Sequence, residues 1–336
     1  MLSTENKLKF GIIGCSRIAE RSVIPAISNS EFGELKMIGS RSMEKAQQFA
    51  NKFKCAKFGT YEDVINDNDV DAVYISLPVG LHEEWTVKAA KSGKHVLCEK
   101  SSTTSYLSAC RMIASCKENK VRFMEGFMFR FHPQHRKVID IIKNGMIGKL
   151  FVFNGMYGFS TIPQSDIRYN PSLGGGVLND AGCYPICASR IIFKEEPIGI
   201  ISNLVIDEKT HVDIRGDLYL MYKDDKSAFV SFGYTNYYQA NYKIWGSEGV
   251  IELQRAYAVP PNLSTDIFLH SNDFNKIQIP PTDHFLLMVN SFCKEILHIE
   301  KSEFDFEDDV LNQARIMEAA RISSKDKKLV NVNDIV

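Results

Sequence analysis

The chain has 336 residues, more than one hydrophobic core usually supports, so we expect two domains. Its content of 44% hydrophobic and 24% charged residues is ordinary for a soluble globular protein. The 40 basic and 41 acidic side chains nearly cancel, which argues against nucleic acid or a membrane surface as a partner. No apolar run approaches the about 20 residues of a membrane span. The first residues lack a signal-peptide pattern, so we expect a cytoplasmic protein.

Eight cysteines are scattered along the chain without a C-x-x-C pair, which predicts free, buried thiols. Cys183 and Cys187 lie one helical turn apart, but no second pair of ligands with zinc spacing accompanies them. We therefore expect no bound metal.

Residues 7–126 alternate short apolar strands with helix-length segments. The expected strands are 8–13, 35–40, 71–77, 95–98 and 121–126, and the expected helices are 18–28, 42–53, 81–92 and 104–119. Ser42 is placed to cap the second helix, and Gly93 to end the third. Strands separated by helices favour a parallel, doubly wound sheet of the Rossmann type, which we assign to residues 1–126.

After residue 126 the pattern changes to longer alternating runs joined by short turns. We expect a helix over 129–142, helices near 283–299 and 308–323, and strands over 150–159, 200–206, 212–222, 228–234, 242–245, 250–253 and 267–270. Short joints such as 223–226 and 246–249 imply antiparallel neighbours. Residues 127–336 should therefore form an α+β domain with an open-faced, mostly antiparallel sheet that helices cover on one face. We assign substrate binding and oligomerisation to this domain.

The turn after the first strand carries Gly14, Ser16 and Ala19 at the three positions of the dinucleotide pattern G-x-G-x-x-G/A. A pyrophosphate meets backbone N–H groups and a helix dipole at such a turn. Serine replaces the middle glycine and is small enough for a close approach. A plain glycine turn is the alternative, but the position after the first strand of a βαβ unit favours nucleotide binding.

The end of the second strand bears on the choice between NAD and NADP. An acidic residue there would bind the ribose 2′-hydroxyl, but this chain has Ser40, Arg41 and Ser42. The guanidinium of Arg41 can clamp a 2′-phosphate, and the serines can donate hydroxyl groups. Although Arg41 could instead be a solvated surface residue, we favour NADP over NAD.

Three residues are candidates for the chemistry. Lys100 follows the strand 95–98 at its carboxyl end, where an ammonium can stabilise an alkoxide or polarise a carbonyl group. Asp180 and Tyr184 lie four residues apart after three glycines and should share a helical face. Beside a lysine, a tyrosine can pass a proton to a substrate oxygen, and the aspartate can orient the substrate or the lysine. The alternatives are a surface lysine in a salt bridge, a helix N-terminal charge and a packing tyrosine.

At these residues the chain resembles the glucose–fructose oxidoreductase, inositol dehydrogenase and rhizopine catabolism (Gfo/Idh/MocA) family. The resemblance extends over Gly11–Ala19, Ser76–Pro78 with His82, Gly93–Lys100, Phe127–Pro133, Asp166–Arg168 and Gly174–Tyr184. It implies a Rossmann domain, an open-faced sheet domain that often buries a dimer contact, and catalytic roles for Lys100, Asp180 and Tyr184. A tyrosine at position 184 is similar to dihydrodiol and xylose dehydrogenases and to sugar-nucleotide 3-ketoreductases.

The resemblance also implies which residues bind ligands. The expected cofactor-binding residues are Gly14, Ser16, Arg17, Ile18, Ser40, Arg41, Leu77, Pro78, His82, Glu99, Lys100 and Arg168. The expected substrate-binding residues are Lys100, Arg130, Asp180 and Tyr184.

The chain departs from the family at three positions. Ser101 stands where the family usually has a proline, often in a cis bond that aims the lysine. A non-proline cis bond costs about 2.5–4 kcal/mol, so we predict a trans bond here. Ser16 replaces the second glycine, and Val79 replaces a common asparagine.

The sequence therefore predicts hydride transfer between a nicotinamide cofactor and a carbinol or ketone of a sugar, a sugar nucleotide or a related polyol. The alternatives are a non-catalytic regulatory protein that binds NADP and a glycosidase that uses a tightly held NAD. A sheet face rich in Phe and Tyr suggests a homodimer or homotetramer formed through the C-terminal sheet.

Overall fold

The computed structural model describes residues 7–336 and divides into two compact units. The first runs to Met128 and includes Phe285–Leu311, whereas the second comprises Phe129–His284 and Asn312–Val336. The sequence placed 285–311 in the second domain. This segment belongs to the first unit because helix α8 (His284–Ile296) packs there, with the ring centroid of Phe292 6.0 Å from that of Phe10.

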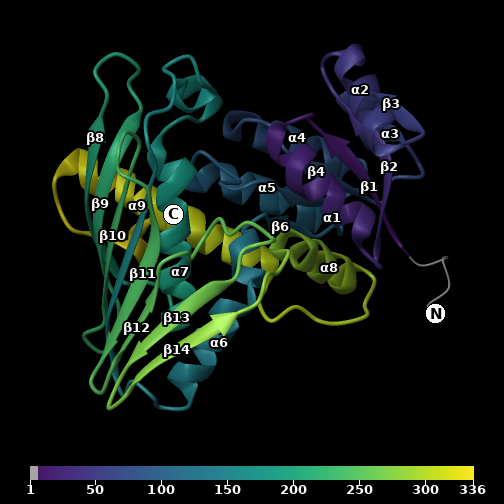
Figure 1. Cartoon of the computed structure of the whole chain (residues 1–336). Coiled ribbons are helices and arrows are strands. Elements are labelled where there is room, and N and C mark those ends of the chain that lie inside the picture. The colour runs from purple at the N-terminus through teal and green to yellow at the C-terminus, as the bar shows by residue number, and fades with distance from the viewer. Residues whose placement is uncertain (1–6) are drawn as a thin grey trace. The chain divides into compact units, whose positions relative to one another are not determined.

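The first unit contains a six-stranded parallel sheet in the order β3-β2-β1-β4-β5-β6 (Figure 1), which confirms the predicted doubly wound sheet. Its strands are β1 (Leu8–Ile13), β2 (Gly33–Gly39), β3 (Lys57–Gly59), β4 (Ala72–Ile75), β5 (His95–Cys98) and β6 (Phe123–Glu125). The chain order reverses at β1, which pairs with both β2 and β4. Ligands of open α/β sheets bind at the carboxyl ends of strands beside such a reversal.

Most helices of the first unit lie where the sequence placed them. They are α1 (Ile24–Asn29), α2 (Met43–Phe53), α3 (Tyr61–Asn66), α4 (His82–Lys91) and α5 (Tyr106–Glu118), and a π-helical turn (Ala19–Val23) precedes α1. The Ser42 side chain accepts a hydrogen bond from the backbone of Lys45 and caps α2 as predicted. We did not predict β3 and α3, because three and six residues are too few to show a clear period.

The second unit contains a nine-stranded sheet in the order β14-β13-β12-β11-β7-β10-β9-β8-β15. Its strands are β7 (Leu150–Gly158), β8 (Gly199–Ile206), β9 (Asp213–Met221), β10 (Ser227–Gly233), β11 (Gln239–Gly246), β12 (Val250–Leu253), β13 (Thr265–His270), β14 (Phe274–Ile279) and β15 (Val330–Asn331). The pair β7–β10 is parallel, and the other neighbouring pairs are antiparallel. The mostly antiparallel sheet is therefore confirmed, although β14 and β15 were not predicted.

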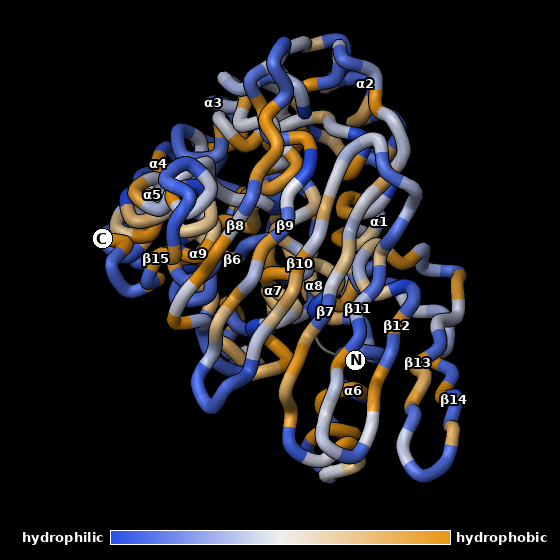
Figure 2. The backbone as a smooth tube through the Cα atoms, turned by 90° about the vertical axis from the view of Figure 1, so that its left-hand side faces the viewer, coloured by the Kyte–Doolittle hydropathy of each residue, from blue (hydrophilic) through white to orange (hydrophobic). Residues whose placement is uncertain are grey.

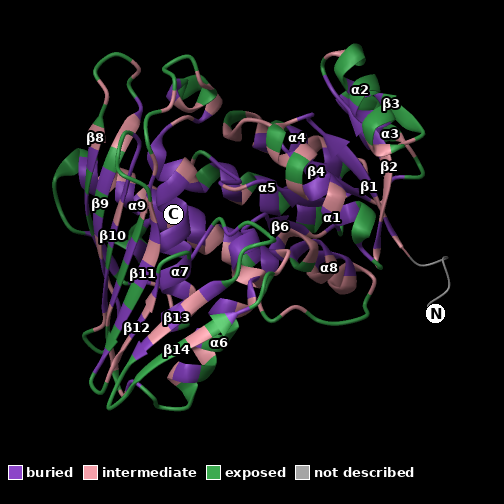
Figure 3. Ribbon diagram, viewed as in Figure 1, coloured by how far each residue is buried: buried purple, intermediate pink, exposed green. Residues whose placement is uncertain are grey.

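One face of this sheet is covered and the other is open. Helices α6 (Pro133–Lys143), α7 (Cys183–Phe193) and most of α9 (Phe306–Asp326) belong to this unit, and α7 is almost wholly buried (Figure 3). Orange segments, which mark apolar residues, recur across the strands (Figure 2). On the open face, Ile201, Phe229 and Trp245 are 47%, 46% and 60% exposed. Across residues 7–336, no helix combines the length and the apolar character that a membrane crossing requires.

Candidate active site

The turn after β1 has the geometry of a phosphate cradle. Gly14 has φ +106°, and an added Cβ would lie 2.9 Å from the Leu77 side chain and 3.0 Å from Ser76 Oγ. Glycine is therefore required at this position. Ser16 Oγ accepts a hydrogen bond of 3.1 Å from the backbone N–H of Ala19. The serine at the middle position of the pattern thus caps the helical turn that follows it.

A cavity of about 230 Å³ lies beside this turn, within the first unit. It brings together five of the residues predicted to bind the cofactor: Gly14, Ser16, Ser40, Arg41 and Leu77. The other lining residues are Cys15, Ser42, Lys45, Tyr61 and Ser76.

Of these lining residues, Lys45 and Tyr61 lie outside the motifs that the sequence analysis singled out. Lys45 lies in the first turn of α2, and the predicted capping of that helix by Ser42 was a signal that could have found it. Tyr61 opens α3, a helix that we did not predict. Burial raises the pKa of the Tyr61 phenol, and Arg41 opposes this effect. The cavity holds two cationic side chains and no carboxylate, a donor set that fits the 2′-phosphate of NADP.

A buried histidine, His82, contacts the backbone of two loops next to the candidate site. It is fully buried, and its Nε2 lies 2.7 Å from the carbonyl oxygen of Leu77 and its Nδ1 3.1 Å from that of Ser101. Burial lowers its pKa to about 4, so the ring is neutral at pH 7. A neutral ring carries one N–H, which donates to one of these carbonyl groups. His82 therefore links the loops after β4 and β5.

The cavity beside Gly14 is not lined by three of the residues expected to bind the cofactor: Arg17, Ile18 and Pro78.

Lys100 follows β5 at the carboxyl end of the sheet, as predicted. The bond between Lys100 and Ser101 is cis, so the predicted trans bond is wrong. That prediction used only the intrinsic preference of a non-proline bond. It ignored tertiary hydrogen bonds around the loop, where the Ser102 N–H donates to Glu125 over 2.6 Å and His82 lies against Ser101.

Glu99, which precedes the lysine, is buried, and Tyr74 Oη donates to its carboxylate over 2.5 Å. Burial raises the pKa of Glu99, and its hydrogen bond with Tyr74 and its interaction with Lys100 oppose that rise. Lys100 is thus held between two residues whose own positions are fixed by hydrogen bonds.

In the second unit, Asp180 lies in a π-helical turn (Leu178–Gly182), and Tyr184 lies in the first turn of α7. The sequence treated both residues as part of one regular helix. A π-helical turn has i→i+5 hydrogen bonds, so the spacing of four residues does not carry the meaning it has in a regular helix.

Arg168 contacts Asp180 directly. Its Nε donates to Asp180 Oδ2 over 2.6 Å, and its Nη1 donates to Asp166 Oδ1 over 3.2 Å. Burial opposes the charge of Arg168, but the two carboxylates outweigh it and raise its pKa. We expected Arg168 at the cofactor, and the structure pairs it with the candidate catalytic aspartate.

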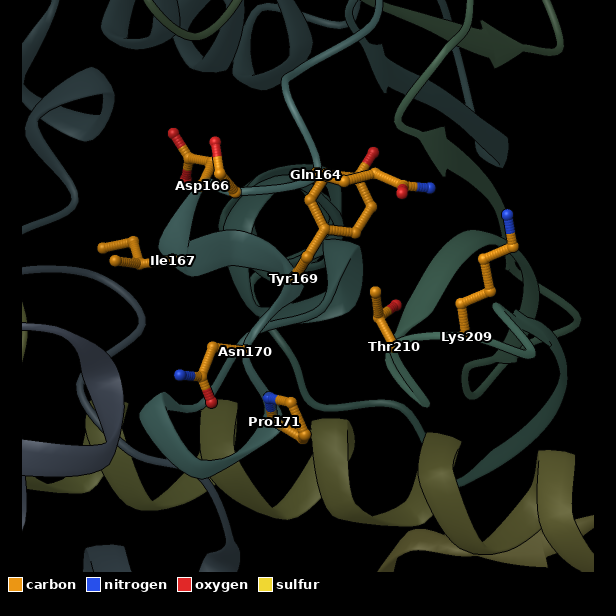
Figure 4. A pocket seen from close by; sticks show the side chains of 9 residues that line it. Gln164, Asp166, Ile167, Tyr169, Asn170, Pro171, Lys209 and Thr210 are labelled. Carbon is orange, nitrogen blue, oxygen red and sulfur yellow. The ribbon is translucent and has the colours of Figure 1, made fainter.

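Asp166 also lines a cavity of about 430 Å³ in the second unit (Figure 4). The loop 164–171 forms one side, with Asp166 and Tyr169, and the turn between β8 and β9 contributes Lys209 and Thr210 on the other. The ion pairs of Arg168 therefore connect the wall of this cavity to Asp180.

Tyr184 is 4% exposed and is surrounded by aromatic rings. Its ring centroid lies 5.1 Å from that of Tyr157, 5.6 Å from that of Phe129 and 5.7 Å from that of Tyr257. This packing fixes the orientation of the phenol. Arg130, an expected substrate residue, is half-buried in a short 3-10 turn (Met128–Phe131).

Buried polar residues fix the backbone that carries Asp180 and Tyr184. Asp213 Oδ2 accepts the N–H of Leu178 over 2.5 Å, and Asn179 Oδ1 accepts a hydrogen bond of 2.6 Å from Arg321. Gly176 has φ +114°, and a Cβ added there would overlap Asp213 Oδ1. No local sequence pattern indicates these contacts, because Asp213 and Arg321 are distant in the chain. Within the described part of the chain, no group of three or more His, Cys, Asp or Glu residues is arranged to hold a metal ion.

Comparisons with known proteins agree with the fold. A family model described as an oxidoreductase family with an NAD-binding Rossmann fold (GFO_IDH_MocA) matches residues 8–127, and the GFO/IDH/MocA C-terminal domain matches residues 135–252. A parallel doubly wound sheet with a glycine turn after its first strand is typical of proteins that bind dinucleotides. The chain belongs to the GFO/IDH/MocA oxidoreductase family.

Two of the similar proteins carry names that denote a sugar or a sugar nucleotide as substrate. A dTDP-3,4-didehydro-2,6-dideoxy-α-D-glucose 3-reductase of Actinomadura kijaniata is 33% identical, and the match covers 96% of this chain and 97% of the relative. A D-xylose 1-dehydrogenase (NADP(+)) of Haloferax volcanii is 31% identical, with 90% and 93% covered. The crystal structure of KijD10, a 3-ketoreductase from Actinomadura kijaniata in complex with NADP and TDP-benzene, superposes with a TM-score of 0.90 at 32% identity and covers 95% of this chain and 98% of that one.

Proposed function

We propose that this chain is an NADP(H)-dependent oxidoreductase that transfers a hydride between the nicotinamide and a carbinol or ketone of a sugar, and we favour a sugar nucleotide as substrate. The observation that carries this proposal is the cavity in which Arg41 and Lys45 meet without a carboxylate, beside the turn at Gly14. The similarity to a sugar-nucleotide 3-reductase over almost the whole chain supports the substrate class.

The first unit would hold the cofactor. Arg41, Lys45 and the serines of the cavity would bind the 2′-phosphate, and the backbone around Gly14 and Ser16 would meet the pyrophosphate. When bound, NADPH supplies the hydride for the reaction.

Each candidate catalytic residue would have a separate task. Lys100 would stabilise the negative charge on the substrate oxygen during reduction. Tyr184 would give its phenolic proton to that oxygen and recover it from solvent or from a neighbouring acid. Asp180, held by Arg168, would orient the substrate hydroxyl or the lysine.

Substitutions of two residues test the proposal. We expect Lys100→Ala and Tyr184→Phe each to lower kcat by about 10²–10⁴-fold with a keto-sugar nucleotide, because each removes an interaction with the reacting oxygen. NADPH binding, followed by nicotinamide fluorescence, should stay within a few fold of the wild-type value. Lys91→Ala, which removes an exposed lysine of α4, is the matched control. A wild-type protein that binds NADPH but reduces none of a panel of keto-sugars would be a sensor, and the proposal would fail.

We also propose a homodimer or homotetramer formed through the open face of the sheet, because Ile201, Phe229 and Trp245 expose large apolar side chains there. Light scattering measures this oligomeric state directly.

We also propose a cytoplasmic location, because all eight cysteines are free thiols.

A further inference from the structure

Two tyrosines and an arginine form an exposed cluster in the second unit. Tyr237 and Tyr238, in the loop between β10 and β11, are 89% and 38% exposed. Arg255, which follows β12, places its guanidinium carbon 5.0 Å from the centre of the Tyr238 ring, and its Nη1 lies 3.4 Å from Tyr238 Oη. Throughout residues 7–336, no carboxylate lies within ion-pair distance of Arg255. The cluster therefore offers an unneutralised cation and a fully solvated aromatic face.

The cluster lies at the same end of the sheet as Tyr184. Ala240 of β11 pairs with Tyr157 of β7, and the Tyr157 ring contacts that of Tyr184. The N–H of Ala256 donates to the carbonyl oxygen of Ala240 over 2.6 Å. Tyr257, the next residue, is also in ring contact with Tyr184.

The distance along the backbone suits one substrate molecule. Tyr238 is two residues from Ala240, and Arg255 is two residues from Tyr257. Even a fully extended chain advances only 3.2–3.4 Å per residue, so the backbone of the cluster lies within about 7 Å of Ala240 and Tyr257. In a sugar nucleotide, the reacting ring carbon and the anomeric phosphate are separated by one pyranose ring. That distance is comparable to the distance between the cluster and these two residues.

The backbone beneath Arg255 is fixed. Gln134 of α6 is fully buried, and its Nε2 donates to the carbonyl oxygen of Arg255 over 3.0 Å. His135 Nε2 lies 2.8 Å from the carbonyl oxygen of Ala256. Arg255 is thus exposed on a backbone that two buried side chains of α6 hold in place, so little order has to be gained when an anion binds.

We propose that Tyr237, Tyr238 and Arg255 form the subsite for the nucleoside diphosphate of the substrate, an inference that rests on the proposed function. The planar fork of Arg255 binds a phosphate oxygen pair, with Tyr238 holding the guanidinium in place. The exposed ring of Tyr237 stacks on the base, as aromatic side chains do with unpaired bases. Free sugars lack both groups and leave this subsite unused.

The test measures binding of dTDP to the full-length enzyme saturated with NADP⁺, by calorimetry. We expect Arg255→Gln to weaken dTDP binding about 10–100-fold, since a hydrogen-bonded charge is lost, and Tyr237→Ala to weaken it about 10-fold. Arg215→Gln, which removes an exposed arginine of β9, should leave binding unchanged. For turnover, Arg255→Gln should lower kcat/KM for a dTDP-linked keto-sugar and leave kcat/KM for the free keto-sugar unchanged.

The outcomes separate this inference from the proposed function. Failure of the wild-type protein to bind dTDP, or equal binding by the wild-type and Arg255→Gln proteins, overturns the subsite. Equal losses in Arg255→Gln and Arg215→Gln also overturn it, because they would reflect net charge alone. Binding of dTDP that depends on Arg255, in a protein that reduces no keto-sugar, would support the subsite and contradict the proposed function. Thermal unfolding midpoints of all variants confirm that each is folded.

Discussion

At the scale of single residues, Arg168 pairs with two carboxylates. The resemblance to the family placed this arginine at the cofactor, whereas its Nε lies 2.6 Å from Asp180 and its Nη1 3.2 Å from Asp166. A guanidinium hydrogen bond of this kind holds a carboxylate in one orientation. We therefore propose that Arg168 positions Asp180.

Arg168→Gln tests this role. We expect kcat to fall about 10-fold or more, because Asp180 loses the charged group that orients it. KM for NADPH should stay within about two-fold, and Arg168→Lys should recover part of kcat, since it keeps the charge without the planar fork. Steady-state kinetics with varied NADPH gives both constants. A large rise in KM for NADPH with unchanged kcat would instead support the cofactor role first assigned to Arg168.

At the scale of elements, the segment that carries Asp180 and Tyr184 depends on one glycine. Gly176 has φ +114° and lies so close to Asp213 that a methyl group would overlap its carboxylate. The same carboxylate accepts the N–H of Leu178 at the start of the π-helical turn. The close approach of Gly176 and Asp213 thus sets where this turn begins.

Gly176→Ala should lower both stability and activity. We expect the free energy of unfolding to fall by more than the about 1 kcal/mol typical of alanine at a positive φ, since the Asp213 carboxylate must also shift. Gly145→Ala is a matched control: Gly145 has φ +72° and open space around an added Cβ. Urea titration compares the two variants. Equal losses would show that the contact with Asp213 contributes nothing.

The elements also show what sequence patterns can and cannot predict. Long periodic segments such as α2, α4 and β7 were predicted within a few residues, because alternation and capping residues are local signals. Short elements such as β3 and α3 carry too few residues for a period to appear. The cis bond between Lys100 and Ser101 was not predicted, and no local pattern around residue 101 reveals the contacts of His82 and Glu125 with this loop.

The same limit applies to the site. Gly14, Ser16 and Arg41 belong to recognisable motifs and were predicted to bind the cofactor, and all three line one cavity. Lys45 and Tyr61 reach that cavity from separate elements, and Asp213 reaches the helix start from a distant strand. These residues come together only in the folded protein, and their spacing along the chain does not reveal it.

At the scale of the whole molecule, buried histidines make stability depend on pH. His132 and His135 are buried in the second unit, and burial lowers their pKa values to about 4 and about 3. In the unfolded chain each titrates near 6.5. Between pH 6.5 and pH 4 the unfolded chain therefore binds more protons, and stability falls as the pH falls. Each such histidine contributes up to about 1.4 kcal/mol per pH unit.

His132→Asn should reduce this dependence. Asparagine keeps a cap for α6, whose first N–H groups His132 now faces, but it does not titrate. We expect the free energy of unfolding, measured by urea titration from pH 7 to pH 4, to fall less steeply in the variant, even if it starts lower. An unchanged slope would show that His132 is protonated in the folded protein at these pH values.

We propose above all that the protein moves a hydride from NADPH to a carbonyl carbon of a nucleotide-linked sugar. The most direct measurement incubates the wild-type protein with a dTDP-linked 3-keto sugar and NADPH deuterated at C4 of the nicotinamide, and follows the product by mass spectrometry and NMR. We expect one deuterium on a new carbinol carbon for each NADPH consumed. Unchanged keto-sugar beside unconsumed NADPH, or reduction without deuterium in the product, would contradict it.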